Sequence, residues 1–289
     1  MPTENDPARP FYLFGDSDLA AERLRLLAEV FAPSTREFLE GLAVHDPRRI
    51  LDLGCGPGYT TRLLADVFPR ADVLGLDNSD AFIEIARQTH HERVAYQLAD
   101  VTQPLPGGPY DLIYCRYLLT HLKYVEPLII QWAAHLLPSG LLAIEENDRI
   151  ETQEAAFEQY LAIAEAMLHA GGYELYIGAK LERSVSFKTL SKKSSECVPI
   201  VVENRDAARM FMMNLDSWTS QSSTSAARRF VEKNFSRDYI ERLRGELGFL
   251  ADGVPRRSPV CFGRRRFVFQ RRQASTTASG SADSIHGSL

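Results

Sequence analysis

Short apolar runs alternate with longer amphipathic stretches over residues 48–150. Five of these runs have the length and composition of buried strands, and they lie at 50–53, 73–76, 94–98, 110–115 and 141–145. Three stretches between them repeat apolar residues with helical spacing, at 59–68, 79–88 and 124–137. Alternation of strands and helices at these distances predicts βαβ units on a parallel sheet, joined by right-handed crossovers.

Helical patterns dominate the amino-terminal flank of this region. Residues 15–31 form an amphipathic stretch that Asp16 or Ser17 can cap at its start. Ser34 and Glu37 have the spacing of a capping box, which predicts that a second helix begins there.

Beyond residue 150 the alternation stops. Helices are predicted at 151–170, 205–216, 226–234 and 237–247, the first of them ending at Gly171-Gly172. The interval 173–204 is ambiguous, because CVPIVVE has the character of a strand whereas residues 183–196 have that of a mobile loop or lid. The alternating pattern around residues 266–269 indicates a final strand, and the low-complexity segment 273–289 is predicted to be disordered.

Composition and charge narrow the class of protein. The 289 residues are 45% hydrophobic and carry a net charge of −5, which allows a sizeable core and disfavours a dedicated nucleic-acid binder. Four cysteines lie far apart without a CxxC pair, so neither a zinc site nor a disulfide framework is expected. No signal peptide is expected, and the uncharged run at 127–144 is cut by the turn signal PSG. We therefore expect a cytoplasmic protein without a membrane segment.

The segment RRILDLGCGPGYT, residues 48–60, places three glycines between a predicted strand and a predicted helix. Such a turn lets a ligand approach the backbone beside the free N–H groups of a helix start. In an open parallel sheet this position is a ligand crevice. A nicotinamide or flavin site has the spacing G-x-G-x-x-G, whereas Gly54, Gly56 and Gly58 follow G-x-G-x-G after Asp52.

At this point the chain resembles the class I S-adenosylmethionine-dependent methyltransferases. The resemblance rests on LDLGCGPGYT, VLGLDNSDAFIEIAR, LADVTQPLP, YDLIYCRYLLTHL and LLPSGLLAIEEND, which follow the family's order over residues 48–148. It implies an α/β fold with a Rossmann-like, seven-stranded, mostly parallel sheet whose last strand is antiparallel, helices on both faces and a helical cap. The implied parts are an N-terminal helical cap (1–45), a cofactor-binding core (46–150), a cap insertion with the strands that complete the sheet (151–272) and the disordered tail (273–289).

The resemblance also implies which residues bind S-adenosylmethionine. Asp52 and the backbone of Gly54 and Gly56, with Cys55 between them, would contact the methionine portion. The acidic Asp77 would accept hydrogen bonds from the ribose hydroxyls. Alternatives remain open from the residues themselves: Asp52 as a helix-dipole partner, Asp77 as a strand-end cap, and Cys55 as a small residue that fits a tight turn.

Further positions follow along the chain. Asn78 would flank the adenine, Asp100 would accept from its amino group and Val101 would donate its N–H. Near the methionine end the implied contacts are Cys115, Arg116, Tyr12 and Arg23. Asp100 has the alternative of a strand-end cap, Arg116 that of a salt bridge, and Cys115 that of core packing.

Catalysis in this family demands little from side chains. A sulfonium methyl is strongly electrophilic, so alignment and exclusion of water do most of the work, and a base is needed only for a poor nucleophile. Candidate bases at the strand ends are His121, Glu145, Glu146 and Asp148. We expect His121 and Glu146 to be the catalytic ones, although His121 can also be a capping or core residue. No metal site is expected.

The predicted function is methyl transfer from S-adenosylmethionine to an oxygen or nitrogen of a small molecule of secondary metabolism, with S-adenosylhomocysteine as product. An alternative is a pericyclase or cyclase that uses the sulfonium charge without transferring the methyl group. An aromatic or apolar acceptor is suggested by the residues Phe157, Tyr160, Met167, Tyr173, Tyr176, Met210, Phe211, Met212, Met213 and Trp218. Ordinary packing in the core or between subunits is the open alternative for the same residues.

No nucleic-acid or membrane partner is expected, and a homodimer is left open. YCRY stands where nucleic-acid amino-methyltransferases of the family carry an NPPY-type tetrapeptide. The basic segment GRRRFVFQRR is interpreted as a solvated edge strand, because charges on an edge discourage pairing with other chains.

Overall fold

The computed structural model describes residues 17–184, 187–220, 226–253 and 259–272. The predicted cofactor contact Tyr12 and the predicted tail 273–289 lie outside the described residues. Among the described helices, none combines the length and the apolar character that a bilayer crossing requires.

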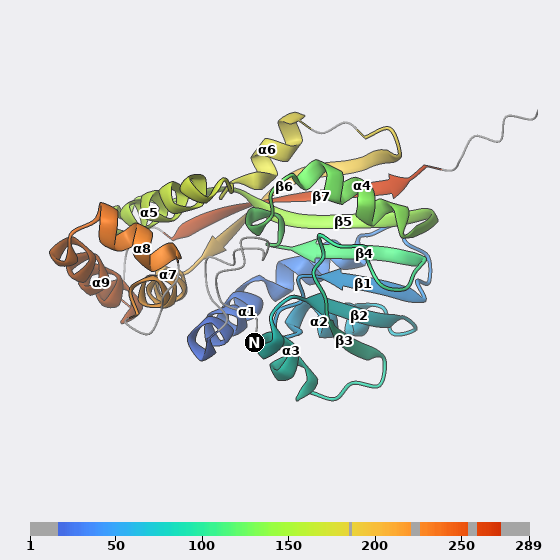
Figure 1. Ribbon diagram of the computed structural model, residues 1–289, viewed down its shortest axis with the longest axis horizontal. Coiled ribbons are helices and arrows are strands. Elements are labelled where there is room, and N and C mark those ends of the chain that lie inside the picture. Colours follow the sequence, from blue (N-terminus) through green and yellow to red (C-terminus); the bar gives the residue numbers. More distant parts are fainter. Residues whose placement is uncertain (1–16, 185–186, 221–225, 254–258, 273–289) are drawn as a thin grey trace, which may run out of the picture.

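A seven-stranded sheet forms the centre of the molecule, in the order β3-β2-β1-β4-β5-β7-β6 (Figure 1). The strands are β1 (Arg49–Leu53), β2 (Asp72–Asp77), β3 (Val94–Leu98), β4 (Tyr110–Arg116), β5 (Leu136–Glu151), β6 (Leu190–Val202) and β7 (Val260–Arg271). Strand β7 runs antiparallel to both of its neighbours, and the other six strands share one direction. The predicted mixed sheet with an antiparallel last strand is therefore confirmed.

Helices cover both faces of this sheet because successive strand residues point to opposite sides. On β1, Ile50 packs with α1 and α2, whereas Leu51 and Leu53 join the core beneath α4 and α6. The helices are α1 (Asp18–Glu40), α2 (Tyr59–Val67), α3 (Asp80–Arg87), η1 (Leu119–His121), α4 (Val125–Ala134), α5 (Ala155–Gly171), α6 (Ile177–Ser184), α7 (Asn204–Thr219), α8 (Ala226–Asn234) and α9 (Arg237–Ala251).

A second apolar core lies where α5, α7, α8 and α9 gather at one end of the molecule (Figure 1). Helix α5 ends as predicted, with Gly172 in the left-handed conformation as its C-cap. Phe31 of α1 and Phe262 of β7 also belong to this core. Both residues tie the helical end of the molecule to the sheet.

The predicted break before Ser34 is wrong. Helix α1 is continuous from Asp18 to Glu40, with Ser17 as its N-cap and Pro33 in its interior. An interior proline removes one backbone hydrogen bond and disfavours the helix. Burial of Phe31 before it and of Phe38 and Leu39 after it outweighs that penalty, because these residues fill two separate cores.

Three further sequence expectations require correction. Helix α4 stops at Ala134 rather than at residue 137, and the predicted turn at 138–140 lies inside the long strand β5. Within the interval interpreted as a loop or lid, residues from Leu190 onward form β6, paired with β7. Strand β7 itself is not an edge strand, since it lies between β5 and β6.

Candidate active site

A cavity of about 370 Å³ lies at the carboxyl ends of the parallel strands. Its lining includes the turn after β1, the end of β2, the residues after β3 and β4, and Asn147 of β5. This is the edge of an open α/β sheet at which ligands bind. The cavity has two sides that differ in chemistry.

We call them the glycine-turn side and the aromatic side. The glycine-turn side consists of Gly54, Cys55, Gly56, Asp77, Asn78, Asp100 and Val101. The aromatic side consists of Phe31, Tyr117, Tyr160, Phe211, Asn214 and Phe262.

The glycine turn depends on backbone conformations that other residues rarely adopt. Gly54, Gly56 and Gly58 have φ values of +69°, +51° and +80°. A Cβ at Gly58 would also overlap the Tyr96 ring, at 2.7 Å from Cε1. The turn is therefore a backbone cradle that exposes main-chain atoms to the cavity.

Two carboxylates are held rigidly beside this cradle. Asp77 accepts hydrogen bonds from the backbone N–H of Gly56 (2.8 Å) and of Ser79 (2.9 Å). Asp100 accepts through Oδ1 from the N–H (2.9 Å) and the hydroxyl (2.7 Å) of Thr102. Both residues thus make strand-end caps, the alternative role considered for them, and both also line the cavity.

Asp52 and Cys115 are not among the described residues that line the cavity. Asp52 is buried beneath the glycine turn, where it accepts from the hydroxyls of Thr60 and Thr61 at 2.7 Å each. Burial raises the pKa of Asp52 to about 6, against the effect of those hydroxyls. Cys115 packs in the apolar core of β4. Their contact with a cofactor stays a prediction.

The two predicted bases have opposite properties. His121 lines the cavity, but burial, with the charge of Arg23, lowers its pKa to about 3. Glu146 is fully buried and is not among the described lining residues. It accepts from the N–H of Leu119 at 2.7 Å, and burial raises its pKa to about 8. His121 has access to the cavity without basicity, and Glu146 has basicity without access.

Arg23 and Arg116 are the cations among the described lining residues. Arg23 is buried on α1, and Arg116 donates to the hydroxyl of Thr35 at 3.2 Å. Arg23 reaches the cavity from α1, and Arg116 reaches it from the end of β4. No group of three or more histidine, cysteine or acidic side chains in the described ranges has the arrangement of a metal site.

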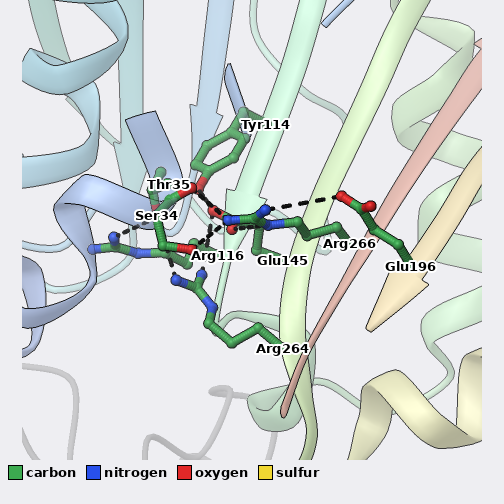
Figure 2. A network of polar contacts seen from close by, with 8 residues as sticks. All are labelled: Ser34, Thr35, Tyr114, Arg116, Glu145, Glu196, Arg264 and Arg266. Atoms are coloured by element: carbon green, nitrogen blue, oxygen red, sulfur yellow. Dashed lines mark hydrogen bonds and ion pairs between the residues drawn. The ribbon is translucent and has the colours of Figure 1, made fainter. Parts of the chain in front are cut away.

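A buried ionic network joins α1 to strands β4, β5 and β7 of the sheet (Figure 2). Glu145 accepts from the Tyr114 hydroxyl at 2.6 Å and from Arg266 Nε at 3.1 Å, and its Oε2 lies 3.2 Å from Arg264 Nη2. Arg266 also donates to the carbonyl and hydroxyl oxygens of Ser34. Burial opposes the charge of Glu145, but Arg264 and the Tyr114 hydroxyl outweigh it and hold its pKa below the ordinary value.

The solvated-edge interpretation of the basic strand is therefore wrong at Arg264 and Arg266. Arg264 is 0% exposed, and its guanidinium lies 4.8 Å from the centroid of the Tyr117 ring and 5.1 Å from that of Phe31. Both rings form part of the aromatic side, so this cation supports the cavity wall. The sequence contained a signal for this burial: Arg264 and Arg266 are two residues apart, which places both side chains on the same face of the strand.

The aromatic side is built from stacked rings. The Tyr160 ring stacks on Phe211 with centroids 4.2 Å apart and on Trp218 at 5.4 Å. Of the aromatic and methionine residues named from the sequence, Tyr160, Met210 and Phe211 line the cavity, whereas Phe157, Met167 and Trp218 are buried in the adjacent core. Asn214, which sequence reasoning missed, also lines the cavity.

Comparison with known proteins places the sequence match in the first half of the chain. A family model described as a methyltransferase domain matches residues 51–144. Trans-aconitate 2-methyltransferase of Methylobacterium nodulans is 36% identical over 132 residues, 46% of this chain and 50% of the relative. The same enzyme of Delftia acidovorans is 38% identical over 144 residues, 49% of this chain and 52% of the relative. The chain thus spans about half the length of the curated relatives it matches.

Solved structures share the fold over most of the chain. The cyclopropane synthase MmaA2 from Mycobacterium tuberculosis has a TM-score of 0.55 at 16% identity, covering 92% of this chain and 100% of that one. The [4+2]-cyclase SpnF has a TM-score of 0.51 at 14% identity, covering 84% and 82%. Residues 51–144 therefore carry a methyltransferase domain that resembles those of the class I S-adenosylmethionine-dependent methyltransferases, whose cofactor is S-adenosylmethionine. The solved structures show that the fold is shared over most of the chain.

Proposed function

We propose that this protein transfers the methyl group of S-adenosylmethionine to a small-molecule acceptor and releases S-adenosylhomocysteine. The observation that carries the proposal is the cavity in which the glycine-turn side and the aromatic side meet. One side has the backbone cradle and fixed carboxylates that suit a nucleoside, and the other has the apolar rings that suit an organic acceptor.

The residues of the glycine-turn side fit the cofactor in chemistry. Gly54 and Gly56 allow main-chain contact with the methionine portion, since they carry no side chain of their own and adopt left-handed φ values. Asp77 and Asp100 are acceptors held in place by backbone donors, which suits the ribose hydroxyls and the adenine amino group. Arg23 and Arg116 supply positive charge for the cofactor carboxylate.

When bound, S-adenosylmethionine supplies a methyl group on a sulfonium centre that is already strongly electrophilic. The contribution of the chain is to hold the acceptor in line and to exclude water. Neither His121 nor Glu146 combines access to the cavity with a suitable pKa. We therefore infer that catalysis rests on alignment, with an oxygen or nitrogen acceptor whose lone pair is available without help from a strong base.

Binding and turnover together test this proposal. Calorimetry is expected to show S-adenosylmethionine binding, and S-adenosylhomocysteine is expected to accumulate when an acceptor from a metabolite panel is present. Replacing Asp77 by Ala should weaken cofactor binding by about tenfold or more, because hydrogen bonds to a charged group are lost.

Asp111 offers a matched control. Its carboxylate also accepts from two backbone N–H groups, those of Arg48 and Arg49 at 2.9 Å each, but at the opposite end of β1. Asp111→Ala should leave cofactor affinity unchanged. No binding at millimolar S-adenosylmethionine would overturn the proposal, and product formation without S-adenosylhomocysteine would favour a cyclase.

A further inference from the structure

The aromatic side of the cavity contains a buried polar pair, Tyr160 and Asn214. Their side chains are 3% and 6% exposed, and both line the cavity. Asn214 Nδ2 donates to the Tyr160 hydroxyl oxygen at 2.5 Å. With the amide in this orientation, Asn214 Oδ1 is buried with no hydrogen-bond partner in the described part of the chain.

The pair presents one donor and one acceptor side by side. The Tyr160 oxygen accepts from Asn214, so its own O–H group is available to donate to a further partner. Asn214 Oδ1 is an acceptor that needs a donor, since a buried polar atom without a partner is unfavourable.

Packing holds this pair in one geometry. The Tyr160 ring lies between Phe211, at an interplanar angle of 15°, and Trp218, at 5°. The two residues come from different helices, Tyr160 from α5 and Asn214 from α7. A rigid donor–acceptor pair on an aromatic wall is the arrangement of a recognition site for a small polar group on an apolar molecule.

We propose that Tyr160 and Asn214 bind a neutral hydroxyl or amide group carried by a flat, ring-bearing methyl acceptor. The group donates to Asn214 Oδ1 and accepts from the Tyr160 O–H, while its ring packs against Phe31, Phe211 and Phe262. This inference rests on the proposed function, since it names the class of molecule that receives the methyl group.

The same geometry disfavours an anionic acceptor at this position. A carboxylate has no proton to donate to Asn214 Oδ1, and it would lose its hydration in an apolar surrounding. The cations of the cavity, Arg23 and Arg116, are assigned to the cofactor carboxylate in the proposed function. Trans-aconitate, named for the relatives, is a tricarboxylate and would require a different acceptor side.

Calorimetry with the 289-residue chain saturated with S-adenosylhomocysteine tests the inference, with naphthol, naphthoate, methoxynaphthalene and trans-aconitate as probes. Naphthol should bind about tenfold or more tightly than naphthoate and methoxynaphthalene, because only naphthol both donates and accepts. Tyr160→Phe and Asn214→Leu should each weaken naphthol binding by about tenfold while S-adenosylhomocysteine affinity stays unchanged.

Tyr239→Phe is the matched control, because Tyr239 also stacks on a phenylalanine, Phe235, but is not among the described residues that line the cavity. It should leave naphthol binding unchanged. Tighter binding of naphthoate or trans-aconitate, undiminished naphthol binding by the Tyr160 and Asn214 variants, or no naphthol binding at millimolar concentration would each overturn the inference. Loss of S-adenosylhomocysteine binding by the unmodified protein would instead refute the proposed function.

Discussion

The two sides of the cavity are specified in different ways. On the glycine-turn side, the carboxylates are held within the same chain unit or the adjacent one: Asp100 by Thr102, and Asp77 by Ser79 and by Gly56 in the turn after the neighbouring strand β1. The aromatic side is assembled from α1, the residue after β4, α5, α7 and β7, which lie far apart in the chain. Contacts within consecutive elements determine the first side, and packing between distant elements determines the second.

This difference limits what the similarity to known proteins says about the two sides of the cavity. The matched methyltransferase domain ends at residue 144, so it contains the glycine-turn side but not Tyr160, Phe211 or Asn214. The match to known methyltransferases therefore covers the glycine-turn side of the cavity. The acceptor has to be inferred from the aromatic side of this chain.

The greatest loss of stability is expected from the buried ionic network that joins α1 to the sheet. Glu145→Ala leaves Arg264 and Arg266 buried without their carboxylate, which should lower the free energy of unfolding by about 3–5 kcal/mol. Urea denaturation measures this loss. The control is Glu196→Ala, because Glu196 is 57% exposed and lies 3.8 Å from Arg266; its effect should stay within about 1 kcal/mol.

The Glu145 variant also tests whether the two sides of the cavity unfold independently. If the two sides are separate units, the Glu145→Ala variant should unfold in two transitions, one for each side. We expect a single transition, because α1 packs with Phe31 in the core of the helical end and with Phe38 against Ile50 of the sheet, and neither contact depends on Glu145. Two transitions would show that the two sides unfold separately, and no loss of stability would show that Arg264 and Arg266 do not depend on Glu145.

The neighbouring Glu146 should control how stability depends on pH. Its pKa is about 8 in the folded protein, against an ordinary value of 4.5. The folded state therefore binds more protons than the unfolded state between these values, so stability should fall as pH rises from about 4.5 to about 8. Glu146→Gln should remove this fall, which amounts to roughly 2–4 kcal/mol.

Denaturation midpoints measured at several pH values test the prediction for Glu146. Glu84→Gln, at an exposed position of α3, is the control and should keep the pH profile of the unmodified protein. A Glu146→Gln profile with the same slope would mean that Glu146 is charged in the folded state at neutral pH.

Two glycine substitutions are expected to have the smallest effects: one in the turn after β1 and one in helix α9. Gly58→Ala should cost about 1–3 kcal/mol of stability, because its φ is +80° and a Cβ would overlap Tyr96. Gly245, on the exposed face of α9, has no neighbouring atom within 4 Å of the position that a Cβ would occupy, so Gly245→Ala should gain about 0.5–1 kcal/mol. Thermal unfolding of both variants measures the contrast, and equal effects would contradict the local origin of the glycine turn.

Several features follow from the sequence alone. The alternation of strands and helices, the glycine turn and the positions of Asp77 and Asp100 at strand ends all agree with the structure. Each feature depends on side-chain periodicity or on a backbone conformation that few residues adopt. Short segments of the chain encode both properties.

Other features depend on tertiary contacts between residues that are distant in sequence. Helix α1 passes through Pro33 because Phe31 and Phe38 are buried on either side of it. The basic strand β7 is buried because β6 pairs with its outer edge and Glu145 neutralises its arginines. The pairing of Tyr160 with Asn214 likewise needs two helices that are distant in sequence to meet. These outcomes depend on contact free energies between remote residues, which no local pattern contains.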